Sequence, residues 1–218
     1  MAIAYPYAVA FLADVLPIRS VTWDIQRSDE LSGLGDGRVW QAELADPLWT
    51  AAVRLDADRH DAMKQIAARI RRLHGAQESF FLFDPLSLYP QADPKGVILG
   101  ASAVEVHSKG ADNQSLRLKG LPAGYVLTIG DKGQVTYSSA PARNFFFECS
   151  ETVVADGDGI TPEFAIFPFI PAGVAADDPV NLVKPACKGF IMPGSHNPGT
   201  ARGSMTDAAA FTFMERRR

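Results

Sequence analysis

Hydrophobic and polar residues repeat with a helical period in one long stretch of the chain, residues 58–75. The apolar positions of this stretch that fall on one stripe of a helix are Met63, Ile66, Ala67, Ile70 and Leu73. Asp58 is placed to cap the start of the helix, and Gly75 is placed to end it. We therefore predict a single long helix whose stripe packs on a sheet formed by the segments of Trp23, Trp40 and residues 80–83.

Apolar and polar residues alternate with a strand period on both sides of this helix. The segments that show this pattern, or an unbroken apolar run, are 21–26, 39–44, 51–55 and 80–83. Residues 28–37 hold three glycines and three acids, which predicts an exposed turn, and Asp46-Pro47 separates the second strand from the third. These elements predict a compact α+β unit.

The pattern of apolar and polar residues changes after about Tyr89, where a linker leads into a stretch in which apolar residues show no helical period. The strands expected there are 115–119, 125–129, 134–138, 144–153 and 163–169. A second linker at residues 171–179 precedes two further strands, 188–192 and 209–215, which complete the first sheet. The expected fold class is α+β, mostly β: an antiparallel, sandwich-like domain with one packed helix (residues 1–92 and 176–218) and an inserted small all-β barrel or sandwich (residues 93–175).

Composition narrows the class of protein. The chain has 218 residues, 47% of them hydrophobic and 21% charged, so it can bury a core, and its net charge of -4 argues against nucleic-acid binding. No apolar run approaches the roughly 20 residues that span a bilayer, and the apolar start lacks the basic region of a signal peptide. The two cysteines do not make a disulfide framework or a zinc site.

Several short motifs occur in a familiar order. A Trp-bearing strand and hairpin precede a helix that ends in Leu73-His74-Gly75, and an aromatic strand then ends in Asp84-Pro85. Further along come Ser-Leu-Arg-Leu-Lys-Gly at 115–120, Gly130-Asp131, Ala-Asp-Gly-Asp-Gly at 155–159 and Phe-Thr-Phe-Met-Glu at 211–215. This order resembles the distal tail proteins and related minor tail proteins of long-tailed, non-contractile bacteriophages. One departure is that Gly130-Asp131 is followed at once by Lys132-Gly133, where an intervening strand is expected.

The resemblance implies a structural virion protein at the phage tail tip, synthesised in the cytoplasm of the bacterial host. It implies a homohexameric ring that joins the tail tube protein to the central hub and carries host-recognition parts. The partners are then other copies of the chain, the tube protein, the hub protein and other tail-tip proteins. Neither nucleic acid nor membrane insertion belongs to this picture.

Candidate contact residues for such a ring lie in three parts of the chain. The N-terminal arm, residues 1–17, is too apolar to be left in water without cost, and the turn 28–37 is free to reach a neighbour. The basic helix face could meet an acidic neighbour. The interface candidates are Tyr5, Tyr7, Phe11, Leu31, Leu34, Asp36, Arg69 and Arg72.

Catalytic chemistry is only weakly indicated. Adjacent Ser195 and His196 in a Gly/Pro loop seldom form a nucleophile–base pair, and no Gly-x-Ser-x-Gly elbow is present. Cys187 with His196 leaves a peptidoglycan-cleaving cysteine hydrolase as the alternative function, although 185–192 has the pattern of a strand. Cys149 alternates with Phe145 and is expected in the core.

Metal and ligand sites are not expected either. Asp156, Asp158 and Glu163 could suggest a calcium loop, but their spacing departs from the EF-hand pattern and fits a hairpin turn. A carbohydrate-binding module, based on the small β-domain, remains a third functional class. The sequence thus predicts a non-enzymatic protein without a catalytic residue, cofactor or metal.

Overall fold

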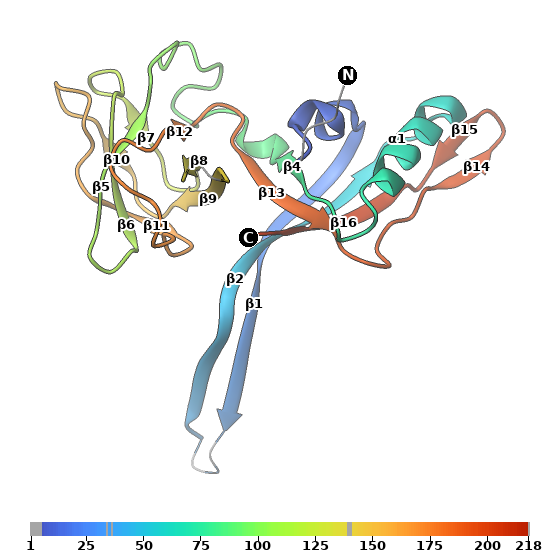
Figure 1. The fold of residues 1–218 in the computed structure, drawn as a ribbon, viewed down its shortest axis with the longest axis horizontal. Coiled ribbons are helices and arrows are strands. Elements are labelled where there is room, and N and C mark those ends of the chain that lie inside the picture. Colours follow the sequence, from blue (N-terminus) through green and yellow to red (C-terminus); the bar gives the residue numbers. More distant parts are fainter. Residues whose placement is uncertain (1–5, 34, 36, 139–140, 218) are drawn as a thin grey trace. The chain divides into compact units, whose positions relative to one another are not determined.

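The computed structural model describes residues 6–33, 35, 37–138 and 141–217. In this part of the chain the fold is mostly β with one α-helix and antiparallel sheets, which confirms the expected fold class. The residues group into two compact units (Figure 1). Unit 1 holds Ala10–Ser79 and Gly189–Arg216, and unit 2 holds Pro6–Val9 and Phe80–Lys188. The domain borders expected at residues 93 and 175 stay a prediction.

Unit 1 is built on an antiparallel sheet. Its strands, in spatial order, are β1 (Ile18–Gly33), β2 (Val39–Leu55), β16 (Ala210–Glu215) and β13 (Ala186–Ile191), the last entering this unit at Gly189. The alternate residues Trp49, Ala51, Val53 and Leu55 of β2 are buried, as the strand period predicts. β1 pairs with β2 and β2 with β16, so the long central strand holds the sheet together.

Two sequence predictions about this sheet are wrong. Residues 28–33 continue β1 instead of forming a turn, and residues 39–55 form one strand instead of two. Asp46-Pro47 does not end the strand, because the pairing of β1 with β2 shifts its register there. Gln26 pairs with Leu48, and Ser28, two residues later, pairs with Ala45, three residues earlier. An extra residue on one strand of an antiparallel pair is a β-bulge, which also tolerates proline.

The helix α1 (His60–Arg72) confirms the apolar stripe of the sequence. Met63, Ile66, Ala67, Ile70 and Leu73 are all buried. The stripe faces Leu55 of β2 and Phe211 of β16 across a nearly filled space. The expected contact with the Trp40 segment is wrong, because Trp40 is 65% exposed.

The start of α1 also differs from the expectation. Asp58 does not cap the helix; β3 (Asp58–Arg59) pairs with β15 (Met205–Asp207), which in turn pairs with β14 (Thr200–Arg202). The imidazole of His60 donates from Nε2 to the Gly203 carbonyl at 2.9 Å and lies 2.7 Å from the Thr206 hydroxyl through Nδ1. This small sheet, which the sequence pattern did not reveal, therefore holds the first turn of the helix.

Truncation of Ile70 tests the packing of α1. We expect Ile70→Ala to lower the free energy of unfolding by about 2–5 kcal/mol, because it removes buried methyl groups and leaves a cavity. Gln65→Ala, on the exposed side of the same helix, is the control and should change it by less than about 0.5 kcal/mol. Urea titration measures both, and equal effects of the two substitutions would contradict this packing.

Unit 2 contains a nearly closed, six-stranded barrel. In spatial order its strands are β12 (Val180–Asn181), β8 (Lys132–Tyr137), β9 (Arg143–Cys149), β11 (Phe164–Phe167), β6 (Ser115–Lys119) and β5 (Glu105–Lys109). The two end strands approach each other, because Val106 N donates to Asp178 O and Val180 N donates to Val104 O. The expected all-β structure of this part of the chain is thus confirmed, although the sequence pattern did not predict β5.

Shorter elements complete the two units. They are β4 (Phe80–Phe83), β7 (Val126–Leu127), β10 (Val153–Val154) and the 3-10 helices η1 (Val9–Phe11), η2 (Ala13–Val15) and η3 (Pro85–Ser87). The linker expected after Tyr89 is an ordered turn, since the buried Asp93 carboxylate accepts from Val97 N and Leu99 N at 2.9 Å each. Burial alone would raise the pKa of Asp93, but these backbone hydrogen bonds outweigh it and lower the pKa.

Candidate assembly surface

The most unusual feature of unit 1 is the far end of the β1–β2 hairpin, which we call the hairpin arm: residues 28–33 of β1 and 39–45 of β2. The two strands are 16 and 17 residues long, and their pairing runs to Gly33 and Val39. β16 covers β2 only from Thr50 to Arg54, so the arm is a two-stranded ribbon that extends away from the rest of unit 1 (Figure 1). A two-stranded hairpin is marginally stable alone in water.

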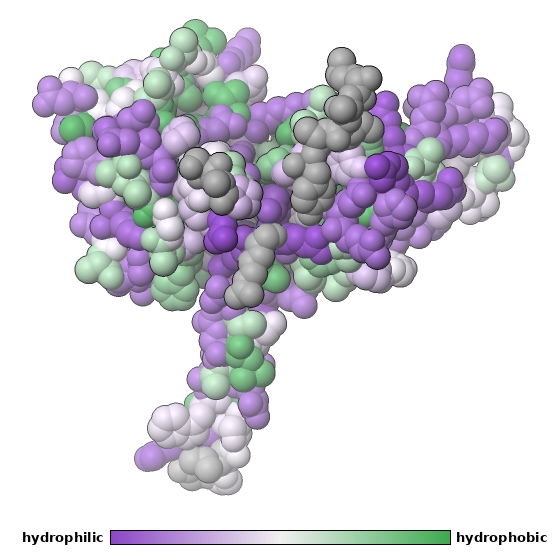
Figure 2. All heavy atoms as spheres, viewed as in Figure 1, coloured by the Kyte–Doolittle hydropathy of each residue, from purple (hydrophilic) through white to green (hydrophobic). Residues whose placement is uncertain are grey.

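Large apolar side chains on this arm are exposed to solvent. Leu31, Val39, Trp40 and Leu44 are between 65% and 68% exposed. Figure 2 shows hydrophobic residues on the projecting hairpin, on the face turned to the viewer. Four exposed apolar residues on one projecting hairpin make it a candidate contact surface.

The regular pairing of the arm separates its two faces. Trp40 and Ala42 lie opposite Ser32 and Glu30, and these four side chains share one face because neighbouring strand residues alternate. The other face carries a polar network. There the Asp29 carboxylate accepts from Arg27 Nε at 2.7 Å and from Gln41 Nε2 at 2.6 Å.

This network makes one face of the arm charged, and the exposed Leu31 and Val39 lie on the same face, because Leu31 pairs with Gln41 and Val39 with Gly33. Arg27 also lies 3.6 Å from the Glu43 carboxylate. The hydrogen bond from Arg27 is the main cause that lowers the pKa of Asp29. The Trp40 face has no comparable set of charges among the described arm residues, so it is the better candidate for contact with a partner.

The described N-terminal interface candidates are buried or half-buried, unlike the exposed apolar residues of the hairpin arm. Tyr5 lies outside the described residues, and Tyr7 is 3% exposed within its own chain, where it forms a parallel bridge with Phe80. Phe11 is half-buried, and its carbonyl accepts from Arg69 Nη1 at 2.7 Å. Tyr7 is therefore already covered by its own chain, and its apolar side chain does not require a neighbouring subunit.

The remaining candidates are divided between the arm and the helix. Leu31 is exposed on the arm, whereas Leu34 and Asp36 lie outside the described residues. Arg69 is half-buried and engaged with Phe11, and Arg72 forms an ion pair with Glu78 at 3.2 Å. Trp40 and Leu44 were missed as contact residues because their alternation is equally typical of a strand with a buried face.

The residues weighed for catalysis make structural contacts. The Ser195 hydroxyl donates to Met192 O at 2.7 Å and accepts from Thr212 N at 3.0 Å. The pKa of His196 is lowered by burial and by the charge of Arg71. Cys149 is buried on β9, where burial raises the pKa of its thiol to about 12, and Cys187 is buried within β13.

The suspected calcium loop is a side-chain-capped turn. The Asp156 carboxylate accepts from Asp158 N at 3.0 Å and from Ile160 N at 2.9 Å. Within the described ranges, no group of three or more His, Cys, Asp or Glu side chains could hold a metal ion. None of the helices in the same part of the chain has the length and apolar character needed to span a bilayer.

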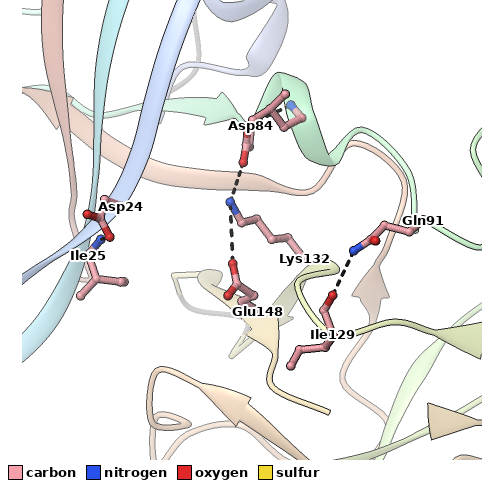
Figure 3. A network of polar contacts seen from close by, with 8 residues as sticks. Asp24, Ile25, Asp84, Gln91, Ile129, Lys132 and Glu148 are labelled. Carbon is pink, nitrogen blue, oxygen red and sulfur yellow. Dashed lines mark hydrogen bonds and ion pairs between the residues drawn. The ribbon is translucent and has the colours of Figure 1, made fainter. Parts of the chain in front are cut away.

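A buried ion pair lies inside unit 2, at the two motifs Asp84-Pro85 and Asp131-Lys132. Lys132 Nζ lies 2.5 Å from Asp84 and 3.9 Å from Glu148, and the side chains of Lys132 and Asp84 are 7% and 3% exposed (Figure 3). The other Asp84 oxygen accepts from Leu86 N at 3.0 Å and so caps η3. The motif Asp-Pro therefore ties the end of β4 to the barrel strand β8.

The residues on either side of Lys132 are also fixed by close contacts. The buried Asp131 carboxylate accepts from Thr128 N at 2.7 Å and from Gln91 N at 2.9 Å, and burial raises the pKa of Asp131. A Cβ at Gly133 would lie 2.4 Å from the Phe147 ring, so only glycine fits there. These residues form a structural joint of the barrel.

Comparison of the chain with protein-family models and with curated proteins finds no match.

Proposed function

We propose that this chain is a structural protein of a bacteriophage tail tip, a distal tail protein whose ring joins the tail tube to the central hub. The observation that carries the proposal is the hairpin arm, with its exposed Trp40 and Leu44 and its length beyond the sheet. A ribbon of this kind gains stability when a neighbour covers its apolar face and its open edges.

The arrangement of the arm also suits a ring. A surface on one subunit that fits a different surface on the next subunit produces either a closed ring or a filament. The arm lies at one end of unit 1, so it can meet a different surface on a second copy and leave the arm of that copy to meet a third. A ring closed by rotation is the form of the homohexamer that the resemblance to distal tail proteins implies.

The peptidoglycan hydrolase is the less supported alternative. Its nucleophile would be Cys187, which lies inside strand β13 with 1% exposure, whereas reactive cysteines are partly exposed in electropositive surroundings. The Ser195 hydroxyl is held by two backbone groups instead of by a base.

Negative-stain electron microscopy of the purified full chain tests the proposed function. We expect closed rings, because each subunit carries one arm that can meet the next subunit. We expect six subunits in each ring, because that is the number the resemblance to distal tail proteins implies. Isolated compact particles at every protein concentration, together with absence of the protein from tails, would refute the proposal.

A further inference from the structure

Unit 1 contains a pocket that lies outside the hairpin arm and that the proposed function does not use. Its volume is about 530 Å³, within the range of pockets that bind small ligands. Arg19, Ser20 and Arg54 line it from β1 and β2, and Asp207 lines it from the end of β15. The other lining residues are leucine and alanine, so two guanidinium groups and one carboxylate share a pocket with small apolar side chains.

The backbone holds the parts of this pocket together. Arg19 is an extra residue of β1 between two pairs that are consecutive on β2, which is a β-bulge, and both Arg19 and Ser20 therefore reach the pocket. The turn after β15 is fixed to the end of β2, because Leu55 N donates to Ala209 O at 2.9 Å. The charged groups thus lie on a connected frame.

The guanidinium of Arg54 is available to a ligand. Arg54 is exposed and has neither an ion pair nor a hydrogen bond through its side chain with any residue that the structure describes. Arg19 lies 4.0 Å from the Asp56 carboxylate, and both side chains are largely exposed, so that ion pair is weak. This part of the pocket therefore offers the fork of donors that a carboxylate accepts in bidentate fashion.

The Asp207 carboxylate is only partly compensated within its own chain. Its Oδ1 has no hydrogen-bond partner among the described residues, and its Oδ2 lies 3.8 Å from Arg202 Nε, which is too far for a hydrogen bond. The side chain of Asp207 is 39% exposed, so a ligand can reach it. A carboxylate in this state is stabilised by a cation that donates hydrogen bonds to it.

A pocket with a guanidinium and a carboxylate that do not pair with each other is complementary to a ligand with two separated, opposite charges. We propose that this pocket binds a zwitterion of dipeptide size. Arg54 and the Ser20 hydroxyl hold the carboxylate of the ligand, and Asp207 holds its ammonium group. The leucine and alanine side chains of the pocket contact the apolar frame between the two ends.

Ligand-observed saturation-transfer NMR with the full chain tests the proposal. The probes are L-alanyl-L-alanine, its N-acetyl form, which lacks the ammonium group, and its C-terminal amide, which lacks the carboxylate. We expect saturable binding of the dipeptide and about tenfold weaker binding of each capped form, because each has lost one charge-assisted contact.

Two variants and a control locate the binding. Arg54→Gln and Asp207→Asn should each weaken dipeptide binding by about tenfold, whereas Arg59→Gln, at an exposed arginine of unit 1 outside the pocket, should not. Arg54→Gln should also bind the dipeptide and its amide equally, and Asp207→Asn should bind the dipeptide and its N-acetyl form equally. A general loss of structure, which circular dichroism checks, would not produce this pairing of variant with probe.

Three results would overturn the proposal. They are the absence of saturable dipeptide binding to the original chain, equal binding of either capped form to the original chain, and unchanged binding by a folded Arg54→Gln or Asp207→Asn chain.

Discussion

Replacing Asp84 by alanine is expected to lower the free energy of unfolding by about 3–5 kcal/mol. The substitution removes the carboxylate nearest to the buried ammonium of Lys132, and Glu148 lies farther away, at 3.9 Å. It also removes the cap on η3, where Asp84 accepts from Leu86 N. Removing the nearest partner of a buried charge costs more than the pair itself contributes, so the loss should exceed that of an ordinary surface ion pair.

Denaturant titration of matched variants separates these effects. Asp84→Asn keeps an acceptor for Leu86 N but removes the charge, so it should be less harmful than Asp84→Ala. Adding Lys132→Met to Asp84→Ala should recover part of the loss, because no buried charge then remains. Asp177→Asn, in the exposed pair with Lys119, should have a much smaller effect. If Asp84→Ala changed stability no more than Asp177→Asn, the buried pair would not be the joint described here.

Replacing Trp40 by glutamate is expected to abolish ring formation while the chain remains folded. Trp40 is 65% exposed on the hairpin arm, so its own chain gains little from the indole. In an interface a buried aromatic residue often contributes about 2 kcal/mol or more, and a ring repeats this loss at every contact. A glutamate at the same position would bring an unpaired charge into the contact.

Trp40→Phe is the matched control for this prediction. It keeps an aromatic, apolar side chain at the same position and should assemble, although more weakly than the original chain. Sedimentation velocity over a range of concentrations measures the assembled fraction, and circular dichroism checks that all three proteins are folded. Full assembly of Trp40→Glu would exclude the Trp40 face as the contact surface.

The parts of the fold that follow from local pattern could be predicted from the sequence. The stripe Met63, Ile66 and Ile70 shows a helical period, and each of these residues is buried in α1. The strand expected at 115–119 is present as β6. Apolar and polar residues alternate strictly over these five positions, a pattern typical of a strand with one buried face. The Cys149 thiol lies in the core for the same reason, since it alternates with buried phenylalanines.

The parts that depend on distant partners could not be predicted in this way. A two-stranded arm and a sheet-forming strand have the same alternating pattern, and only the extent of β16 decides that Trp40 stays exposed. The ion pair joins Asp84 to Lys132 across 48 positions of the chain, and neither residue shows its partner locally. The β14–β15 hairpin was missed because its strands have only three residues each.

In the proposed assembly, the chain closes into a ring through the hairpin arm. Replacing residues 30–42 by Asn-Gly would connect the paired residues Asp29 and Glu43 through a two-residue turn and remove most of the arm. Native mass spectrometry of the full chain and of this shortened chain tests the claim most directly. We expect a single species of six subunits for the full chain and monomers for the shortened one. Monomers in both cases, or unchanged hexamers after removal of the arm, would contradict this assembly.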